Sequence, residues 1–360
     1  MTHIASPAGA LDLSAVQLDV EEVLREFLNH KEQAAPGPEM APLFATLRRL
    51  LASGKRLRAQ LCVAGWHADD GGHRTSSMAT AAAAALELFQ AFALIHDDVM
   101  DASDTRRGRP SAHRALSAAY TAGGGRRSRS DAHGRSAAVL LGDLALVWSD
   151  ELLHGGVDPG ALARILPFVA DMRNELVYGQ YLDLLSTDRL SGNIDTALRV
   201  ARYKTAKYTV ERPLHIGAAL AGAGPEILEA CSAFALPLGE AFQLRDDLLG
   251  VFGDPAETGK PVGDDIREGK ATVLLALAMQ RASADDLCVL RMLVGRPDLT
   301  DEDIFRVRAV LEATGAREHV EEMIHARRST AVTVLEQGPI PAAAAGALRA
   351  IAQIATVRRS

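Results

Sequence analysis

The sequence predicts an all-α protein that forms one large domain. Alanine and leucine are abundant, apolar residues recur at helical spacing, and the alternation of apolar and polar residues that marks a strand is almost absent. Hydrophobic residues make up 48% of the 360 positions, which is enough for a sizeable core. No linker or internal repeat divides the chain, so we expect a single domain over residues 1–360.

Helical patterns follow one another along most of the chain. Residues 16–33 carry an apolar stripe, and residues 40–53 form a short helix that ends at Gly54. Residues 75–101 begin with a serine cap and are apolar on most sides, so this helix is expected at the centre of the fold. "SGKRLRAQ" begins another helix. Further helices are predicted over residues 137–153, 160–185, 195–222, 225–252, 271–284, 301–314, 317–336 and 340–356.

Three segments lack this pattern. Residues 1–15 are expected to be flexible, and residues 252–270 to form a polar loop. Residues 121–136 are rich in Gly, Arg and Ser and predict an exposed loop. A nucleic-acid-binding patch is the alternative for residues 121–136, but the segment lacks the aromatic neighbours on which bases stack.

The charge and cysteine content narrow the function classes. A net charge of −7 argues against a nucleic acid or an anionic membrane as partner. The three cysteines, Cys62, Cys231 and Cys288, lie far apart, so we expect neither a disulfide framework nor a structural zinc site. From this cysteine usage, and because no signal-peptide pattern is visible, we expect a cytoplasmic location.

One segment is long enough to span a membrane. Residues 79–100 form an apolar run, but Glu87 lies within it and two aspartates lie at its end. Because buried charges are costly in lipid, we expect no stable membrane insertion.

The same segment ends in an acidic cluster. Asp97, Asp98 and Asp101 lie at positions i, i+1 and i+4, so the first and last share one helical face. Two carboxylates one turn apart can bind the same hard cation, and Mg²⁺ prefers oxygen ligands shared with substrate phosphates. A solvated acidic helix end is the alternative explanation.

A second acidic pair makes the metal interpretation stronger. Asp246 and Asp247 again end an apolar helical run, with Gln243 one turn earlier. We expect the two clusters to face each other across a cavity and to bind a diphosphate through several Mg²⁺ ions.

Basic residues accompany both clusters. Arginine and lysine suit phosphate oxygens, although any one of these residues taken alone would be assigned to the solvated surface. The basic groups and their polar neighbour are Lys55, Arg56, Arg58, Arg106, Arg107, Lys204, Thr205 and Lys260.

These motifs together resemble the trans-isoprenyl diphosphate synthases of the polyprenyl synthetase family. The matching stretches, in order, are "SGKRLR", "LIHDDVMDASDTRRGRPSAH", "LLGD", "YKTA" and "FQLRDDLLGVFGDPAETGKPVGDDIREGK". The resemblance implies a helical bundle around a central apolar cavity. It also implies Mg²⁺-dependent, head-to-tail condensation of isopentenyl diphosphate with an allylic diphosphate, and a homodimer.

The resemblance also assigns roles by motif position. Ionisation of the allylic diphosphate is assigned to the acidic motifs, with Asp98 in support, and to Arg106, Lys204 and Lys260. Three Mg²⁺ ions are expected, bound by Asp97, Asp101, Asp246 and Asp247. The allylic diphosphate is assigned to Arg106, Lys204, Thr205, Gln243, Lys260 and Lys270, and isopentenyl diphosphate to Lys55, Arg58, Gln90 and Arg107.

Three positions depart from the family pattern. Gly250 replaces the usual last Asp of the second acidic motif, which removes one potential ligand. "SGK" stands where "GGK" is commoner, and Ala59 stands where proline often follows.

Product length is expected to depend on the side chains one turn or more before Asp97. Phe92 is bulky, Ala93 is small, and Phe89 lies a turn deeper. In the family, one aromatic residue five positions before the motif accompanies a geranylgeranyl product, so we predict geranylgeranyl diphosphate, with farnesyl diphosphate as the alternative. Ordinary core packing is the other interpretation of both phenylalanines.

Two histidines and two other classes of protein are alternatives to this interpretation of the site. His96 and His113 flank the first motif, and structural hydrogen bonding is favoured over a role as general base. A class I terpene cyclase would share the acidic motifs, but aromatic residues are only 4% of the chain and the second motif lacks the cyclase form. A non-catalytic synthase subunit is the third possibility, suggested by Gly250 alone.

Overall fold

The computed structural model describes residues 11–69, 75–187, 189–254 and 263–357, and it confirms the all-α class. The chain divides into two compact units. The first contains the described residues up to Ile165 together with Ile216–Ala223, and the second contains Leu166–His215 together with the described residues from Gly224 onward. The single domain expected from the sequence stays a prediction.

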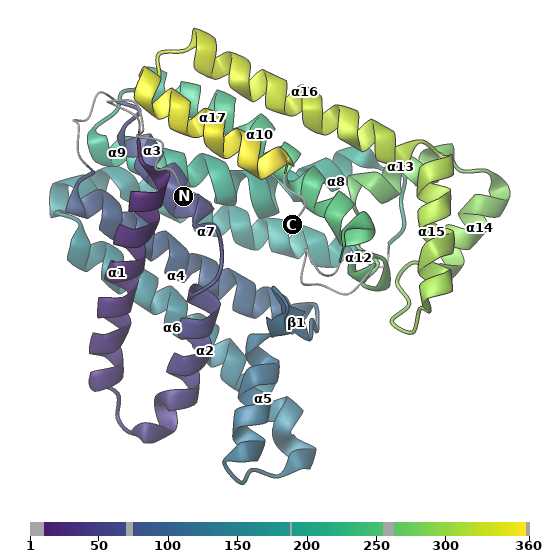
Figure 1. Cartoon of the computed structure of the whole chain (residues 1–360), viewed down its shortest axis with the longest axis horizontal. Coiled ribbons are helices and arrows are strands. Elements are labelled where there is room, and N and C mark those ends of the chain that lie inside the picture. The colour runs from purple at the N-terminus through teal and green to yellow at the C-terminus, as the bar shows by residue number, and fades with distance from the viewer. Residues whose placement is uncertain (1–10, 70–74, 188, 255–262, 358–360) are drawn as a thin grey trace, which may run out of the picture. The chain divides into compact units, whose positions relative to one another are not determined.

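The first unit is built around α4 (Ser77–Met100), which packs against α6 (Ser130–Gly156), α3 (Leu57–Trp66) and α1 (Leu13–Gln33) (Figure 1). The consecutive alanines of α4 are buried, and their small side chains let the neighbouring helices approach closely. The other elements of this unit are η1 (Pro38–Met40), α2 (Ala41–Leu51), β1 (Thr105–Arg106), β2 (Arg109–Pro110), α5 (Ala112–Ala122), η2 (Arg127–Arg129), the first turns of α7 (Pro159–Ser186) and the end of α9 (Arg212–Ala221).

The helix α4 begins and ends where the sequence indicates. The Ser76 side chain accepts a hydrogen bond from the backbone N–H of Ala79, as an N-cap does. At the other end, the N–H of Asp101 still bonds to the carbonyl of Asp97 at 2.9 Å, and the next residue, Ala102, adopts a left-handed φ of 53° that stops the helix. Both acidic positions i and i+4 are therefore presented at the last turn of a central helix.

Two described helices, α4 and α10 (Pro225–Phe252), are long and apolar enough to cross a membrane by length and composition. In the most apolar 18-residue stretch of each helix, 67% is buried inside the structure in α4 and 50% in α10. Core helices of a bundle give the same pattern, so this finding does not favour a membrane span.

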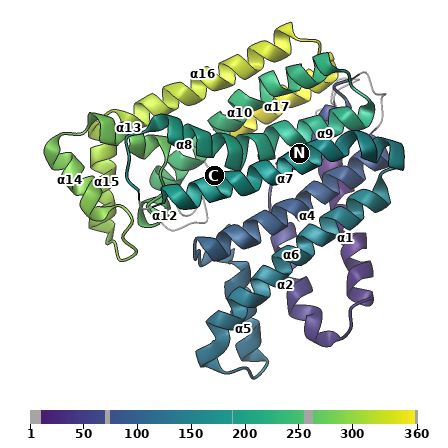
Figure 2. The same ribbon diagram turned by 180° about the vertical axis from the view of Figure 1, so that it is seen from behind.

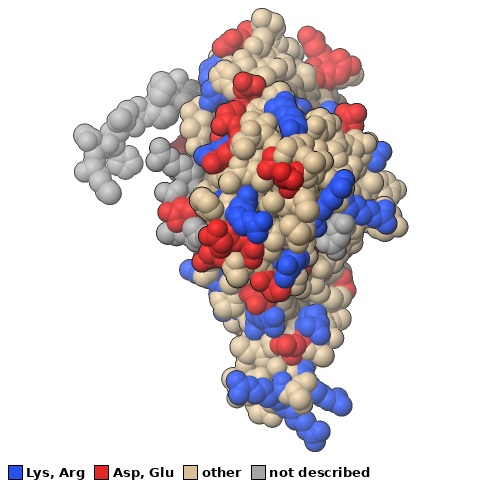
Figure 3. All heavy atoms as spheres, turned by 90° about the vertical axis from the view of Figure 1, so that its right-hand side faces the viewer, with Lys and Arg blue, Asp and Glu red and all other residues tan. Residues whose placement is uncertain are grey.

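The predicted loop at residues 121–136 is shorter than expected. These residues are largely exposed, and Figure 3 shows Lys and Arg side chains gathered at the lower end of the view, where α5 and η2 lie. However, η2 and the start of α6 occupy residues 127–136. Packing on α5 overrides the loop-like composition: the rings of Tyr120 and His133 stack at 4.1 Å, and Arg114 pairs with Asp131 in the first turn of α6.

The second unit is organised around α10, which packs against η3 (Ala201–Glu211), α16 (Ala316–Gln337) and α17 (Ala342–Val357), as Figure 2 shows from behind. Glu240 on α10 is buried and binds Arg202 of η3 and Arg327 of α16, so one carboxylate ties three helices together. The remaining elements are the rest of α7, α8 (Ile194–Val200), the start of α9, α12 (Asp264–Arg267), α13 (Val273–Arg281), α14 (Ala284–Leu293) and α15 (Asp301–Ala313).

The prediction of one continuous α-helix over residues 195–222 is wrong for residues 201–211, which form a π-helix. The structure has α8, then the π-helix η3, then α9. Glycines on both neighbours let backbones meet η3: a Cβ on Gly179 would lie 2.2 Å from the N of Lys204, and one on Gly239 would lie 2.4 Å from the Cα of Ala206. Such π-helical turns occur mostly at functional sites.

Two smaller differences concern the start of α1 and the helix α14 (Ala284–Leu293). Asp12 caps α1 through the N–H groups of Ser14 and Ala15, so the helix begins at Leu13 and not at residue 16. The expectation of flexibility therefore fails for residues 13–15, and residues 1–10 lie outside the described part of the chain. The sequence also does not predict α14, a short helix capped by Ser283.

Candidate active site

The first acidic cluster is held by an arginine that follows it in the chain. The Arg106 Nε donates to Oδ1 of Asp98 at 2.8 Å, and its Nη2 donates to Oδ2 of Asp97 at 3.1 Å. Asp98 is only 1% exposed. Burial alone would lower the pKa of Arg106, but the charges of Asp98, Asp97 and Asp101 raise it above its ordinary value. The arginine is therefore permanently charged between the carboxylates.

The left-handed residue Ala102 turns the chain back toward the end of α4, and Arg106 lies in the first strand of a tight hairpin that follows. Strands β1 and β2 pair with Arg106 opposite Arg109, and the two residues between them, Arg107 and Gly108, both have positive φ, at 53° and 70°. A two-residue hairpin turn with two positive φ angles matches the right-handed twist of its strands. The sequence motif "TRRGRP" thus encodes a turn as well as a set of charges.

The hairpin also fastens Arg107 to the "SGK" segment. Its Nη1 donates to the carbonyl of Ser53 and, at 3.2 Å, to the Ser53 hydroxyl, while that hydroxyl donates to the carbonyl of Leu50. A Cβ on Gly54, where φ is 119°, would lie 2.7 Å from Arg107 Nη1, so the guanidinium needs glycine there. Although Arg107 taken as a residue is exposed, desolvation of its guanidinium lowers the pKa of this group, and the positive charges of its arginine neighbours lower it further.

Several of the predicted cations therefore gather in one region. The arginines whose charges act on Arg107 are Arg106, Arg58 and Arg56. A group of mutually repelling cations on one side of an acidic cluster is suited to an anionic ligand.

Arg56, however, has a structural role. It is 5% exposed and pairs with the equally buried Glu87 of α4, with 3.2 Å between Nη1 and Oε2. It also donates to the carbonyl of Leu51 and adopts a left-handed φ of 52° at the start of α3. A buried charge needs such a partner, so Arg56 ties α3 to α4 and is not available to a ligand.

In the second unit, η3 and α10 bring the "YKTA" motif to the second acidic motif. The Thr205 hydroxyl donates to Oε1 of Gln243, and Gln243 Nε2 donates to Oδ1 of Asp247 at 2.8 Å. Next to this chain, Lys204 Nζ pairs with Asp183 of α7 at 2.6 Å. The "YKTA" motif, with Lys204 and Thr205, and the second acidic motif, with Gln243 and Asp247, are therefore brought together.

The second acidic cluster is dominated by the burial of Asp247, which is 6% exposed. Burial raises the pKa of Asp247 to about 8; the hydrogen bond from Gln243 opposes the shift, and the negative charges of Asp265 and Asp246 add to it. The charge of Lys270 also opposes the shift, and its Nζ lies 3.6 Å from Asp265 Oδ1 and 3.0 Å from Glu268 Oε2.

The donor set of this second cluster fits a divalent cation. Its oxygen ligands are of the type that Mg²⁺ prefers, and an added cation would relieve the repulsion that raises the pKa of Asp247. Within the described ranges, no three His, Cys, Asp or Glu side chains are grouped so as to hold an ion by themselves. The carboxylates would therefore share the ion with water and with substrate oxygens, which is common for Mg²⁺.

The remaining predicted residues are placed as follows. Lys260 lies outside the described residues. Phe89 is buried, and Phe92 is half-buried with its ring between those of Phe89 and His96, at 5.3 and 4.8 Å. Ala93 is half-buried on the next position.

Both histidines near the first motif have structural partners. His96 Nε2 bonds to the carbonyl of Val139 on α6 at 3.0 Å. His113 is buried and bonds to the Ser111 hydroxyl at 3.2 Å, and burial lowers its pKa. These contacts agree with the structural interpretation of both residues.

The sequence analysis missed three polar residues that touch the site. Ser53 fastens Arg107, Asp183 pairs with Lys204, and Asp265 lies against the second acidic cluster. Ser53 was visible as a departure from the family pattern, and Asp265 lies inside the quoted "GDDIREGK" stretch. Asp183 had no signal, because its partner is distant in sequence.

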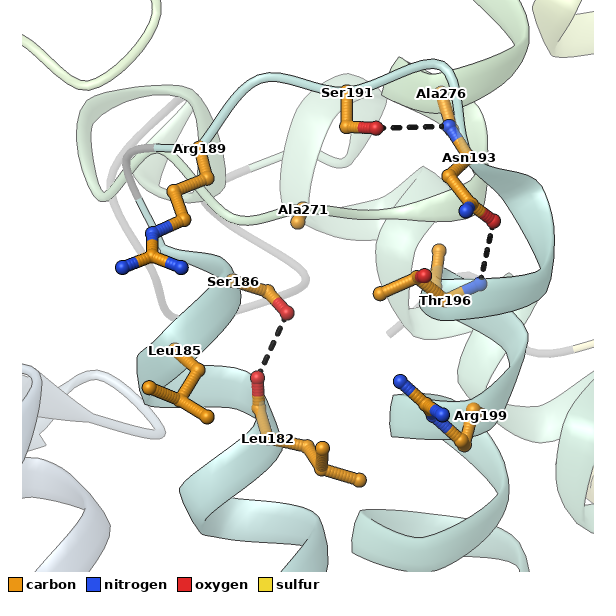
Figure 4. Close-up of a pocket in the computed structure, with 11 residues that line it drawn as sticks. Leu182, Leu185, Ser186, Arg189, Ser191, Asn193, Thr196, Arg199, Ala271 and Ala276 are labelled. Atoms are coloured by element: carbon orange, nitrogen blue, oxygen red, sulfur yellow. Dashed lines mark hydrogen bonds between the residues drawn. The ribbon is translucent and has the colours of Figure 1, made fainter.

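A separate cavity of about 270 Å³ opens between the end of α7, the start of α8 and the segment before α13 (Figure 4). Leu182 and Leu185 line it from α7, Arg199 from α8, and Ala271 next to Lys270. None of the described site residues predicted from the sequence lines it.

The raised pKa of Asp247 predicts how stability depends on pH without metal. Because the folded state holds this proton more tightly than the unfolded chain, the stabilisation is fully present below pH 3.8 and is lost as the pH rises to about 8. In chelator, Asp247→Asn should therefore melt at a higher temperature than the native protein at pH 9, and at a similar temperature at pH 4. Equal melting temperatures at pH 9 would contradict the raised pKa.

Comparison with known proteins agrees with these motifs and this fold. The family model described as polyprenyl synthetase matches residues 41–312. A crystal structure of geranylgeranyl pyrophosphate synthase from Corynebacterium glutamicum, complexed with isoprenyl diphosphate and magnesium, has a TM-score of 0.92 and 42% identity, covering 96% of this chain and 99% of that one.

Curated relatives agree with this result. The geranylgeranyl diphosphate synthase of Mycobacterium tuberculosis is 33% identical over 79% of this chain and 75% of its own length. The geranylfarnesyl diphosphate synthase of Aeropyrum pernix is 31% identical over 77% of this chain and 81% of its own. The resemblance predicted from the motifs is confirmed: the chain belongs to the polyprenyl synthetase family and is a short-chain trans-prenyltransferase.

Proposed function

We propose that this prenyltransferase condenses isopentenyl diphosphate head to tail with an allylic diphosphate, and that its main product is geranylgeranyl diphosphate. The observation that carries the proposal is the pairing of Arg106 with Asp97 and Asp98 at the end of α4. It places a permanent cation from β1 next to potential metal ligands on the last turn of α4. The relative from Corynebacterium glutamicum, which is complexed with isoprenyl diphosphate and magnesium, supports the assignment.

The allylic diphosphate is assigned to Arg106, Lys204, Thr205, Gln243, Lys260 and Lys270. Among these, the contacts of Lys204 with Asp183 and of Thr205 with Gln243 fix the two side chains before substrate arrives. Such preorganisation lowers the cost of stabilising the charge that develops on the leaving group.

Isopentenyl diphosphate is assigned to the cationic region next to the hairpin. Arg107 and Arg58 lie close enough for their charges to interact, and Lys55 and Gln90 complete the predicted set. The anchoring of Arg107 on Ser53 supports this assignment, because a fixed fork loses little entropy when it binds an anion.

We assign three Mg²⁺ ions to the site, with Asp97, Asp101, Asp246 and Asp247 as ligands and Asp98 in support. When bound, Mg²⁺ neutralises the diphosphate and makes it a better leaving group. The side chains of the chain itself have two tasks: Arg106 and the lysines hold the diphosphate oxygens as the allylic C–O bond breaks, and the apolar helices exclude water from the allylic cation. The proton lost after attack by isopentenyl diphosphate goes to the released pyrophosphate, since no side-chain base is assigned.

We also propose a cytoplasmic homodimer. Large apolar side chains are exposed on α6 and α7, and a second copy would cover them. They are Val139, Leu140, Val147, Leu166, Val177, Tyr178, Tyr181, Leu184 and Leu185.

The assignment of the two acidic motifs predicts the effect of neutralising them. Asp97→Asn and Asp246→Asn should each lower kcat by at least about a hundredfold, as loss of a group that stabilises the leaving charge does. Asp19→Asn, on an exposed position of α1, is the control and should be unchanged. The assay uses radiolabelled isopentenyl diphosphate with and without Mg²⁺. In the native protein, linear elongated products support the synthase, cyclic hydrocarbons would indicate a cyclase, and no product would indicate a non-catalytic subunit.

The anchoring of Arg107 predicts a selective effect of changing Ser53. Ser53→Gly restores the commoner family residue but removes a hydrogen bond worth about 1 kcal/mol. KM for isopentenyl diphosphate should rise by about fivefold, while KM for the allylic substrate stays constant. Ser53→Thr keeps the hydroxyl and should behave like the native enzyme. A fall in kcat alone would argue against the assignment of Arg107.

The position of Phe92 predicts a change of product. Because the Phe92 ring is half-buried, Phe92→Ala should lengthen the product detected by chromatography without unfolding the protein. Phe89 is 2% exposed, so Phe89→Ala should cost about 3–5 kcal/mol of stability. Unchanged product length in the Phe92→Ala enzyme would remove Phe92 as the residue that limits chain length.

A further inference from the structure

An arginine-rich tip lies where α5 ends and α6 begins. Its three arginines, Arg126, Arg127 and Arg129, lie in and next to η2, and all three are exposed. We call these three residues the arginine tip, and Figure 3 shows basic side chains gathered where α5 and η2 lie. Within the described ranges, no acidic side chain forms an ion pair with any of the three.

The acidic residue nearest to the tip in sequence is already engaged. Asp131 accepts a hydrogen bond from Nη1 of Arg114 on α5 at 3.1 Å and another from the Ser117 hydroxyl at 3.3 Å. Arg114 is itself shared with Asp104, at 2.6 Å. The tip therefore presents three positive charges that repel one another, and a concentration of one sign of charge on a surface attracts an anionic partner.

Packing against α5 holds the tip in place. The rings of Tyr120 and His133 stack at 4.1 Å, and the N–H of Gly125 bonds to the carbonyl of Tyr120 at 2.9 Å. A Cβ on Gly134 would lie 2.3 Å from the carbonyl oxygen of His113, so α6 approaches the backbone of α5 directly. Arginines displayed from such a fixed element lose less conformational freedom on binding than arginines in a flexible loop.

The chemistry of the tip fits the headgroups of anionic lipids. Arginine binds phosphate oxygens in bidentate geometry, and each basic residue near an anionic bilayer strengthens binding by about fivefold. Each CH₂ of a prenyl chain that enters a bilayer favours the transfer by about fourfold, so the product of a prenyltransferase accumulates in bilayers. A single-stranded nucleic acid would also need exposed aromatic rings, whereas Tyr120 is half-buried against His133.

The overall net charge of −7 does not exclude such a partner. Electrostatic interactions in solution decay over about 8 Å at physiological ionic strength, so a bilayer responds to the face that lies nearest to it. Residues 121–136 carry four arginines and one aspartate, and the excess of acidic residues lies in the rest of the chain. A bilayer would therefore attract the tip and repel the remainder, which orients the protein on the surface.

We propose that the arginine tip docks the enzyme reversibly on bilayers that contain anionic phospholipid. The docking is peripheral, and no helix enters the hydrocarbon. It goes beyond the proposed function, because it depends neither on the product length nor on the residues assigned to metal and substrate. Release of an amphipathic product beside a bilayer shortens the passage of its prenyl chain through water.

The test is co-sedimentation of the full chain with vesicles of phosphatidylglycerol and phosphatidylcholine, compared with vesicles of phosphatidylcholine alone. The native protein should bind only the anionic vesicles, and added salt should weaken the binding. Replacing the three arginines of the tip together, by Arg126→Gln, Arg127→Gln and Arg129→Gln, should weaken it by about a hundredfold.

The matched control removes the same charge elsewhere, from exposed arginines of α14, α15 and α17, by Arg291→Gln, Arg306→Gln and Arg349→Gln. This variant should bind anionic vesicles like the native protein. Both triple variants should keep the native melting temperature and prenyltransferase rate, because neither changes a residue placed in the active site.

Four results would overturn the proposal: no binding of the native protein to anionic vesicles, equal binding to neutral vesicles, native affinity in the tip variant, or equal losses in the tip and control variants. Tip-dependent binding to an oligonucleotide that is tighter than binding to vesicles would also overturn it, in favour of a nucleic acid. The synthase function is tested separately by the elongation assay, and none of these results would alter it.

Discussion

Carboxylates packed side by side at the end of an apolar helix repel one another, and the site described above depends on how this repulsion is balanced. At the end of α4 the balance is built into the chain, because Arg106 bonds to both Asp97 and Asp98. At the end of α10, burial and the charges of Asp265 and Asp246 raise the pKa of Asp247 to about 8. A cation bound beside Asp247 would relieve this repulsion.

The fold serves these two clusters by allowing close approach around them. The left-handed Ala102 returns the chain to the end of α4, and the hairpin turn at Arg107 and Gly108 pairs Arg106 with Arg109. In the second unit, Gly179 and Gly239 let two helices contact the backbone of η3, which presents Lys204 and Thr205 from a π-helical turn. Backbone geometry that is unusual elsewhere is concentrated next to the predicted site, as expected where function constrains the chain.

Much of this could be predicted from the sequence, because the relevant signals are local. Helix periodicity gave the all-α class, and the spacing of Asp97 and Asp101 placed both on one turn. The features that were missed depend on tertiary contacts. The partner of Arg56 is Glu87 in another helix, and the close approach of neighbouring backbones to η3 depends on glycines in those neighbours. The start of α6 at Ser130 likewise follows from packing on α5 that overrides a loop-like composition.

The central claim is that both acidic clusters bind divalent cations around one pyrophosphate. Its most direct test is the anomalous scattering of Mn²⁺ in crystals of the protein grown with manganese and pyrophosphate. The account predicts manganese peaks beside Asp97 and Asp101 and beside Asp246, joined through the oxygens of a single pyrophosphate. Manganese bound at only one cluster, or pyrophosphate held elsewhere by cations of the protein alone, would contradict it.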